Sequence, residues 1–201
     1  MSKKKLFVMC GNPGSGKSTW IQNNLHTFEG YTSVVSRDQI RFLFVPEGED
    51  YFSRETEVYA KFIDDIQFGL EYADNVIVDA THLNEGSRGK LLRRIGSALK
   101  GVEVIAVVIK VPLKVSLDQN EKRKGSRSYV PRSVVRRMYY QFTMPTFEEG
   151  FDKIYVYNPY KEGAKYTIFE KENKRGNIND MPYDEFPKTI CWCSKKKKKK
   201  M

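Results

Sequence analysis

The segment that most constrains the fold of this chain lies near its start, where an apolar run gives way to a glycine-rich turn. Residues 5–10 read KLFVMC, residues 11–18 read GNPGSGKS, and a helical pattern follows. A continuously apolar run is typical of a strand that is covered on both faces. A strand, a G-x-x-x-x-G-K-[ST] turn and a helix in this order predict a loop that binds the phosphates of ATP or GTP.

Apolar runs and amphipathic stretches alternate along most of the chain. Strands are expected at residues 5–10, 31–36, 75–80, 102–110 and 152–158. Helices are expected at residues 17–28, 54–73, 84–99, 112–123 and 131–145. This alternation predicts an α/β fold: a parallel sheet with helices on both faces.

The 201 residues suit one domain with a small appendage. Residues 1–159 are predicted to form the domain that contains the glycine-rich turn. Residues 160–194 are polar and turn-rich, which indicates an irregular extension packed on that domain, with an edge strand or hairpin near 165–172. Residues 195–201 are almost all lysine and are expected to be disordered, because they bury no apolar area.

The net charge of +10 is concentrated in a few places. Lysine runs at 3–5 and 195–200 account for nearly all of it, so the body between them is close to neutral. Within that body, residues 110–137 carry nine Lys or Arg against two acidic residues. This segment is a candidate anion-binding surface.

The three cysteines, Cys10, Cys191 and Cys193, fit neither a disulfide framework nor a zinc site, and we expect them to be reduced. The apolar run after the first lysines is too short for a signal peptide, and no other segment has the length of a membrane span. The sequence therefore predicts a cytoplasmic protein without a membrane partner.

The glycine-rich turn supplies the residues that are expected to hold a nucleotide. Its glycines let successive N–H groups point inward at phosphate oxygens, and the helix that follows adds the positive end of its dipole. Lys17 is expected to reach the β- and γ-phosphates, and Ser18 to bind Mg²⁺, with Thr19 as a second hydroxyl. The full predicted set is Gly11, Asn12, Pro13, Gly14, Ser15, Gly16, Lys17, Ser18 and Thr19.

A phosphate loop alone does not distinguish hydrolysis from transfer. The base-reading N-K-x-D element of GTPases is absent from the sequence, and the chain is short for a motor ATPase. A small phosphotransferase needs a base for the acceptor hydroxyl, a group that holds the acceptor, and arginines that stabilise the transferred phosphoryl group.

Asp38 and Arg41 are the candidates for the first two tasks. Asp38 follows the second predicted strand, at the edge of the sheet where ligands of open α/β folds bind, and its carboxylate suits a general base. Arg41 lies three residues later, on the same face of a helix, and can grip a phosphate bidentately. Alternatively, Asp38 only caps this helix and Arg41 is a solvated charge.

The third predicted strand ends in VIVDATHLN at residues 76–84. Asp79 occupies the usual place of a carboxylate that orients Mg²⁺. Thr81 and Asn84 are candidates for bracing the loop or the acceptor, although a helix-capping turn explains Asn84 equally well. His82 has no neighbouring metal ligands and is expected to be a supporting or surface residue.

Residues 120–142 hold most of the local positive charge and read as a helix end, a basic turn and a new helix. A connection of this kind can close over a bound nucleotide. Arg123 and Arg127 are the candidates for contacting ATP phosphates. Arg132, Arg136 and Arg137 either follow a nucleic-acid backbone or solvate their helix.

Taken together, these motifs resemble the phage-type polynucleotide 5′-hydroxyl kinase family over residues 4–158. The shared elements, in order, are PGSGKSTW at 13–20, the RD pair with its later arginine at 37–41, Thr-x-Leu-Asn at 81–84, and Asn120, Arg123, Val130–Pro131 and Arg137–Tyr139. The resemblance implies that Asp38 is the general base and that Arg41 holds the 3′-phosphate of the terminal nucleotide. It also implies that Lys17 and Arg123 contact ATP phosphates.

Two departures concern the lid: Gln119 stands where the family has an arginine, and the lid is a residue longer. The resemblance implies that residues 1–159 form the P-loop kinase domain, with a parallel sheet, helices on both faces and a short basic lid, and we expect a stand-alone kinase module without the phosphatase or ligase domain of some relatives. The expected function is an ATP- and Mg²⁺-dependent kinase of DNA or RNA 5′-hydroxyl ends. A small-molecule kinase and a module that binds without catalysis remain alternatives, and a homo-oligomer remains open.

Overall fold

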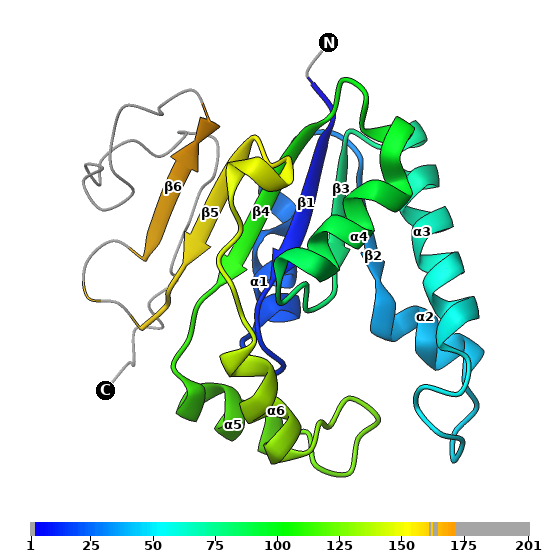
Figure 1. Cartoon of the computed structure of the whole chain (residues 1–201), viewed down its shortest axis with the longest axis vertical. Helices are drawn as coiled ribbons and strands as arrows, with labels where there is room; N and C mark the ends of the chain where they lie inside the picture. Colours follow the sequence, from blue (N-terminus) through cyan, green and yellow to red (C-terminus); the bar gives the residue numbers. More distant parts are fainter. Residues whose placement is uncertain (1–2, 161, 163–164, 172–201) are drawn as a thin grey trace, which may run out of the picture.

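The computed structural model describes residues 3–160, 162 and 165–171, and its centre is the apolar strand that precedes the glycine-rich turn. β1 (Lys5–Cys10) lies between β3 (Asn75–Asp79) and β4 (Glu103–Ile109). The described strands form a sheet of order β2-β3-β1-β4-β5-β6 (Figure 1). β1 to β5 pair in parallel, so the predicted parallel sheet is confirmed.

The outer strands of the sheet include one from the segment after the predicted domain. β2 (Thr32–Ser36) forms one edge, and β5 (Lys153–Tyr157) continues the parallel part on the other side. β6 (Tyr166–Glu170) pairs antiparallel with β5, so the strand expected near 165–172 is present. The remaining extension to residue 194 and the lysine tail at 195–201 lie outside the described residues.

Two apolar layers form because side chains of a strand point alternately to opposite faces. Leu6, Val8 and Cys10 of β1 pack in the larger core, against α3 (Glu55–Tyr72) and α4 (Glu85–Ile95). Phe7 and Met9 belong to the second core, with α1 (Lys17–Asn24) behind the sheet in Figure 1. Helices therefore cover both faces, as expected.

The carboxyl ends of the parallel strands gather the segments that carry the chemistry. β1 leads into the glycine-rich turn, β2 leads into α2 (Arg37–Phe44), and β4 is followed by α5 (Leu113–Glu121) and α6 (Arg132–Tyr140). α2, α5 and α6 lie below this edge in Figure 1. Short 3₁₀ turns occupy Leu25–Thr27, Gly96–Leu99 and Phe147–Glu149. No described helix combines the length and the apolar character needed to cross a bilayer.

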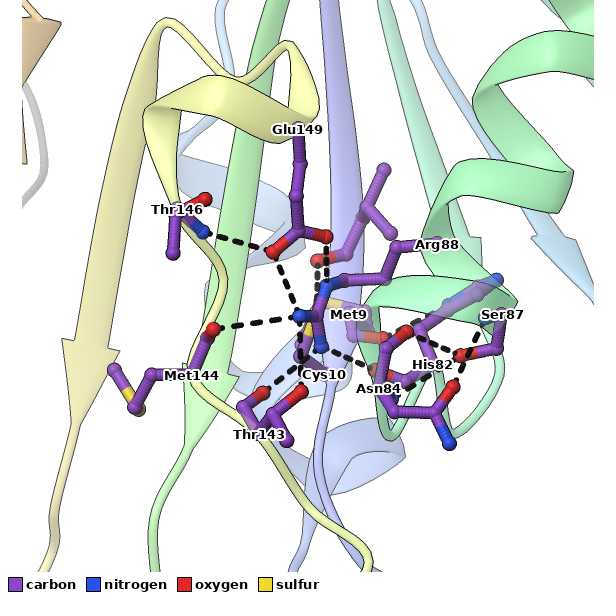
Figure 2. Close-up of polar contacts among 11 residues, drawn as sticks. Met9, Cys10, His82, Asn84, Ser87, Arg88, Thr143, Met144, Thr146 and Glu149 are labelled. Atoms are coloured by element: carbon purple, nitrogen blue, oxygen red, sulfur yellow. Dashed lines mark hydrogen bonds and ion pairs between the residues drawn. The ribbon is translucent and has the colours of Figure 1, made fainter.

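A fully buried arginine on α4 joins the turn after β3 to the segment that leads into β5 (Figure 2). Arg88 donates to Glu149 from Nε and Nη2, over 2.6 and 2.8 Å, and to the carbonyl oxygens of His82, Thr143 and Met144. Glu149 in turn accepts from the Thr146 backbone N–H. Every N–H of the guanidinium thus has an acceptor, which compensates the cost of burying its charge.

The turn after β3, which Arg88 holds, also contacts the glycine-rich turn and the strand before it. His82 is buried at a positive φ of 38°, and its Nδ1–H donates to the Met9 carbonyl over 3.0 Å. The Thr81 carbonyl accepts from the Gly11 N–H over 2.9 Å. The turn after β3 is therefore held between the end of β1 and the Arg88 network, and it fixes where Asp79 lies.

Breaking the buried pair should destabilise the whole domain. Arg88→Met leaves the Glu149 carboxylate buried without its counterion, which costs about 3–5 kcal/mol of unfolding free energy. The measurement is urea unfolding followed by far-UV circular dichroism. Arg94→Met, an exposed site on the same helix, is the control and should change the unfolding free energy by about 0.5 kcal/mol or less. Equal losses in the two variants would contradict a structural role for the pair.

The buried histidine should make stability depend on pH. Burial lowers the pKa of His82 from 6.5 to about 4, so the unfolded chain binds a proton between these values and the folded chain does not. Acidification from pH 6.5 to 4 should therefore cost about 3 kcal/mol from this group, and His82→Asn should flatten that part of the stability curve. His26→Asn, at an exposed site, should leave the slope unchanged. An unaltered slope in His82→Asn would refute the assignment.

Candidate active site

The glycine-rich turn is shaped by backbone conformations that only glycine adopts easily. Gly14 has φ +74°, and a Cβ there would lie 2.4 Å from the Ser116 carbonyl oxygen. Gly16 has φ +95° and immediately precedes the first turn of α1. The turn therefore packs closely on α5 while it presents the start of α1, where an anion is favoured.

Lys17 folds back over this turn. Its Nζ donates to the Gly11 and Asn12 carbonyl oxygens over 3.0 and 3.1 Å, and the side chain is buried. Burial lowers the pKa of Lys17, while the Asp79 and Asp38 carboxylates act in the opposite direction. These carboxylates therefore lie close enough to the ammonium to influence its charge.

Ser18 and Asp79 meet at the start of α1 and the end of β3. The Ser18 hydroxyl donates to Asp79 Oδ2 over 2.8 Å. Burial raises the pKa of Asp79, and Lys17 and the Ser18 hydrogen bond oppose that shift. A hydroxyl and a carboxylate side by side are oxygen ligands of the kind Mg²⁺ prefers, with water and phosphate oxygens completing its shell. No group of three His, Cys, Asp or Glu side chains suited to a metal occurs among the described residues.

The turn also contains buried polar atoms without a partner in the described part of the chain. These atoms are the Asn12 amide nitrogen and oxygen and the Ser15 hydroxyl. Pro13 is buried beside them, whereas Ser18 and Thr19 are exposed. Buried polar atoms normally find a hydrogen-bond partner, and a bound phosphate group would supply one here. The residues thus fit the nucleotide that the motif implies.

Asp38, in the first turn of α2, belongs to a hydrogen-bonded cluster. Asp38 Oδ1 accepts from Arg41 Nη1 over 2.9 Å and from the Tyr51 hydroxyl over 2.8 Å. Arg41 Nη2 donates to Glu55 Oε2 over 2.6 Å. The Arg41 side chain is 5% exposed and that of Asp38 is 59% exposed. Arg41 is therefore an internally paired cation, and Asp38 is its accessible partner.

Tyr51 and Glu55 were missed by the sequence interpretation. Glu55 pairs with both Arg37 and Arg41, which lower its pKa against the opposing effect of burial. Arg37 also lies 5.0 Å above the ring of Tyr59. These contacts join α2 to α3 across a loop. Residue spacing in a single sequence does not predict contacts of this kind. Arg88 was also missed, although the sequence contains a signal for it: it is a charged residue on the same helix face as the apolar residues Leu91 and Ile95.

Two lid residues next to each other on α5 have separate roles. Asn120 is buried, donates to the Val130 carbonyl over 2.6 Å and accepts from the Val130 N–H over 3.1 Å, so it closes the base of the lid. Gln119, which replaces an arginine of the resembled family, has its Oε1 3.9 Å from the position of a Cβ on Gly16. A neutral amide thus lies beside the phosphate loop.

The lid arginines are not equivalent. Arg123 is near enough to affect the pKa values of Lys17 and Asp79, and its guanidinium makes no hydrogen bond within the described ranges. Arg127 instead donates to the Phe42 and Val45 carbonyl oxygens over 3.3 and 2.5 Å, at the end of α2. Arg127 is thus anchored on the end of α2, and its contact with a nucleotide stays a prediction.

The remaining predicted residues lie in the turn after β3. Thr81 bonds the glycine-rich turn through its carbonyl oxygen, as described above. Asn84 is the N-cap of α4: its Oδ1 accepts from the Ser87 N–H over 3.0 Å, and Ser87 bonds the Asn84 N–H in return. The capping alternative therefore accounts for the Asn84 side chain, and an acceptor contact for either residue stays a prediction.

The family model described as an AAA domain matches residues 6–145, which is more than half of the chain. The chain belongs to this AAA-domain family. The matched range begins in β1 and ends after α6, so the AAA domain contains the phosphate loop, Asp38, Asp79 and the lid. Its fold is that of a P-loop kinase, with a mostly parallel sheet flanked by helices.

A curated relative, the transcription factor bHLH140 of Arabidopsis thaliana, is 22% identical to this chain over 185 residues. The alignment covers 90% of this chain but only 18% of the relative. Several solved structures share the fold at TM-scores above 0.5, and two of them illustrate the range. The Pnkp1/Rnl/Hen1 RNA repair complex (TM-score 0.59, 22% identity) aligns over 70% of this chain and 44% of that one. A gluconokinase from Sinorhizobium meliloti 1021 (TM-score 0.51, 16% identity) aligns over 80% and 86%.

The close packing of the phosphate loop on α5 in the AAA domain can be tested with two glycines. Alanine at Gly48, which has φ +93° and open space around it, should cost about 1–2 kcal/mol from backbone strain alone. Gly14→Ala adds a clash with the Ser116 carbonyl, so it should cost more and weaken nucleotide binding at least about 10-fold. Urea unfolding and titration with a fluorescent ATP analogue measure both effects. Similar behaviour of the two variants would show that the packing is unimportant.

Proposed function

We propose that this AAA domain is an ATP-dependent kinase that transfers the γ-phosphate to the 5′-hydroxyl end of DNA or RNA. The observation that carries the proposal is the place of Asp38. Its exposed carboxylate is one of the charges that oppose the lowering of the Lys17 pKa by burial, so it lies near that ammonium, and one carboxylate oxygen is held by two donors. A base beside the phosphate loop serves transfer to an alcohol, which nucleotide binding alone does not require.

The proposed reaction is a single displacement. The acceptor hydroxyl oxygen forms a bond to the γ-phosphorus, the bond from that phosphorus to the β–γ bridging oxygen breaks, and ADP leaves. Asp38 takes the proton of the hydroxyl as the new bond forms. The acceptor oxygen approaches from the Asp38 side, opposite the leaving group, as in-line transfer requires.

Cationic groups would stabilise the charge on the transferred group. Lys17 would exchange its bonds with the loop carbonyls for phosphate oxygens, and Arg123, whose guanidinium has no hydrogen bond among the described residues, is positioned to join it. Ser18 and Asp79 would hold Mg²⁺. When bound, this ion neutralises phosphate charge and orients the nucleotide.

The exposed surface beyond the lid supports a polynucleotide acceptor. Arg132, Arg136 and Tyr140 recur at four-residue spacing along α6 and are all exposed, with Arg137 beside them. Cations that follow a phosphate backbone and an aromatic ring that stacks on a base are the usual elements of single-strand binding. The RNA repair complex among the structural neighbours is consistent with such an acceptor, and so is the resemblance to polynucleotide 5′-hydroxyl kinases.

The second candidate is a kinase of a small-molecule hydroxyl, and the state of Arg41 favours it. The family resemblance assigns this residue to the 3′-phosphate of the acceptor. Here its guanidinium is buried and already bonds Asp38, Tyr51 and Glu55. A phosphate would have to displace these partners, whereas an acceptor without one would not. The gluconokinase neighbour shows that the fold also serves small acceptors.

A labelling experiment separates the candidates. The chain is incubated with γ-labelled ATP, Mg²⁺ and 5′-hydroxyl DNA or RNA oligonucleotides, and separately with nucleosides, nucleoside 3′-monophosphates and a simple sugar. The same oligonucleotides with 5′-phosphate ends are the control and should remain unlabelled. Label on 5′-hydroxyl oligonucleotides is the expected result. Label only on small acceptors would favour the second candidate, and ATP binding without any transfer would refute both.

Asp38→Asn should separate transfer from nucleotide binding. The amide keeps the size of the side chain but cannot take a proton, so kcat should fall at least about 100-fold. Affinity for ATP should change less than about 2-fold, because the proposed work of Asp38 is on the acceptor. Asp64→Asn, on the exposed face of α3, is the matched control and should behave as wild type. A parallel loss of ATP affinity in Asp38→Asn would contradict the assignment.

A further inference from the structure

We propose that Tyr51 is a positioning residue for Asp38, and that its hydroxyl, together with Arg41, fixes the carboxylate so that Oδ2 is the oxygen that meets the acceptor. This inference deepens the proposed function and rests on it. Tyr51 lies in the loop between α2 and α3, outside every motif described above.

The three polar groups form a closed triangle around one oxygen atom. The Tyr51 hydroxyl donates to Asp38 Oδ1 over 2.8 Å, and Arg41 Nη1 donates to the same oxygen over 2.9 Å. Arg41 Nη1 also donates to the Tyr51 hydroxyl oxygen over 3.1 Å. Asp38 Oδ2 makes no hydrogen bond in the part of the chain that the structure describes. Two charge-assisted bonds on Oδ1 therefore leave Oδ2 as the accessible oxygen.

Further contacts of Arg41 and Tyr51 anchor the triangle. Glu55 holds the second nitrogen of Arg41, and the Tyr51 ring lies 4.5 Å from the centre of the guanidinium. Phe52 packs edge-on against the Tyr51 ring at 5.0 Å. Asp38, by contrast, is mostly exposed on the first turn of α2, and its hydrogen bonds to Tyr51 and Arg41 hold its carboxylate. The order of the base is therefore imposed by its partners.

Tyr51 keeps its proton under working conditions. Burial and the neighbouring Asp38 carboxylate raise the pKa of Tyr51 to about 12. The hydroxyl is thus a donor throughout the neutral range, and it can hold the carboxylate without competing for the acceptor proton.

The test removes one oxygen atom. Tyr51→Phe keeps the ring that packs on Arg41 and Phe52 and deletes the hydroxyl. With whichever acceptor the wild type phosphorylates, kcat should fall about 10-fold, the size expected for one hydrogen bond to a charged group. KM for ATP should stay within about 2-fold. Tyr59→Phe is the matched control, because the Tyr59 hydroxyl is buried nearby and has no hydrogen-bond partner among the described residues, and its kcat should match wild type.

A double variant distinguishes positioning from a general effect on packing. If Tyr51 acts only through the carboxylate, Tyr51→Phe should have no further effect on the residual rate of Asp38→Asn. An additive loss would overturn the inference, and so would wild-type kcat in Tyr51→Phe. Neither result affects the proposed function, which fails only if the wild type labels no 5′-hydroxyl end. A wild-type chain that phosphorylates no acceptor at all would overturn both.

Discussion

The positive charge of a buried ammonium group needs hydrogen-bond acceptors and negative charges nearby. The groups that supply them to Lys17 form the candidate site. Two loop carbonyls bond the ammonium directly, and Asp79 and Asp38 supply negative charge from the ends of neighbouring strands. Each carboxylate lies where it does because a parallel strand ends there. A bound triphosphate would bring several negative charges into the same place, so it would replace the loop carbonyls as the partner of the lysine. The loop carbonyls and the two carboxylates therefore supply the negative charge that the phosphates of a nucleotide would bring.

Arg41 shows why the same residue types support two acceptor classes. As a free cation it would attract a phosphate on the acceptor. As a cation paired with Asp38 and Glu55 it instead orders the Asp38 carboxylate. Burial distinguishes these two states, because a guanidinium excluded from water keeps partners that a solvated one exchanges freely. Under the proposed function, the choice of acceptor would therefore depend on whether an incoming phosphate can compete with Glu55, which is a property of the cluster and not of Arg41 alone.

The sequence was sufficient for features that depend on neighbours along the chain. The strand, turn and helix around Lys17 lie where the pattern predicts them, and the parallel order of strands brings Asp38 and Asp79 to one edge. It was insufficient where side chains meet across a loop: Tyr51 joins Asp38 only because the chain between α2 and α3 folds back on Arg41. The end of the helix predicted to reach residue 145 was also placed too late, since α6 ends at Tyr140 and the segment after it bonds Arg88.

The lid differs from the resembled family at Gln119, and its arginines contact different elements. Asn120 donates to the Val130 carbonyl and accepts from the Val130 N–H, so the two ends of the basic turn are held together. Within that turn Arg123 lies near the phosphate loop and Arg127 bonds the end of α2, the helix that carries Asp38. The two arginines of one short turn thus lie toward different parts of the candidate site: Arg123 toward the phosphate loop and Arg127 toward the helix of Asp38. Because Gln119 is neutral and lies beside Gly16, Arg123 is the lid cation that the described structure brings near Lys17.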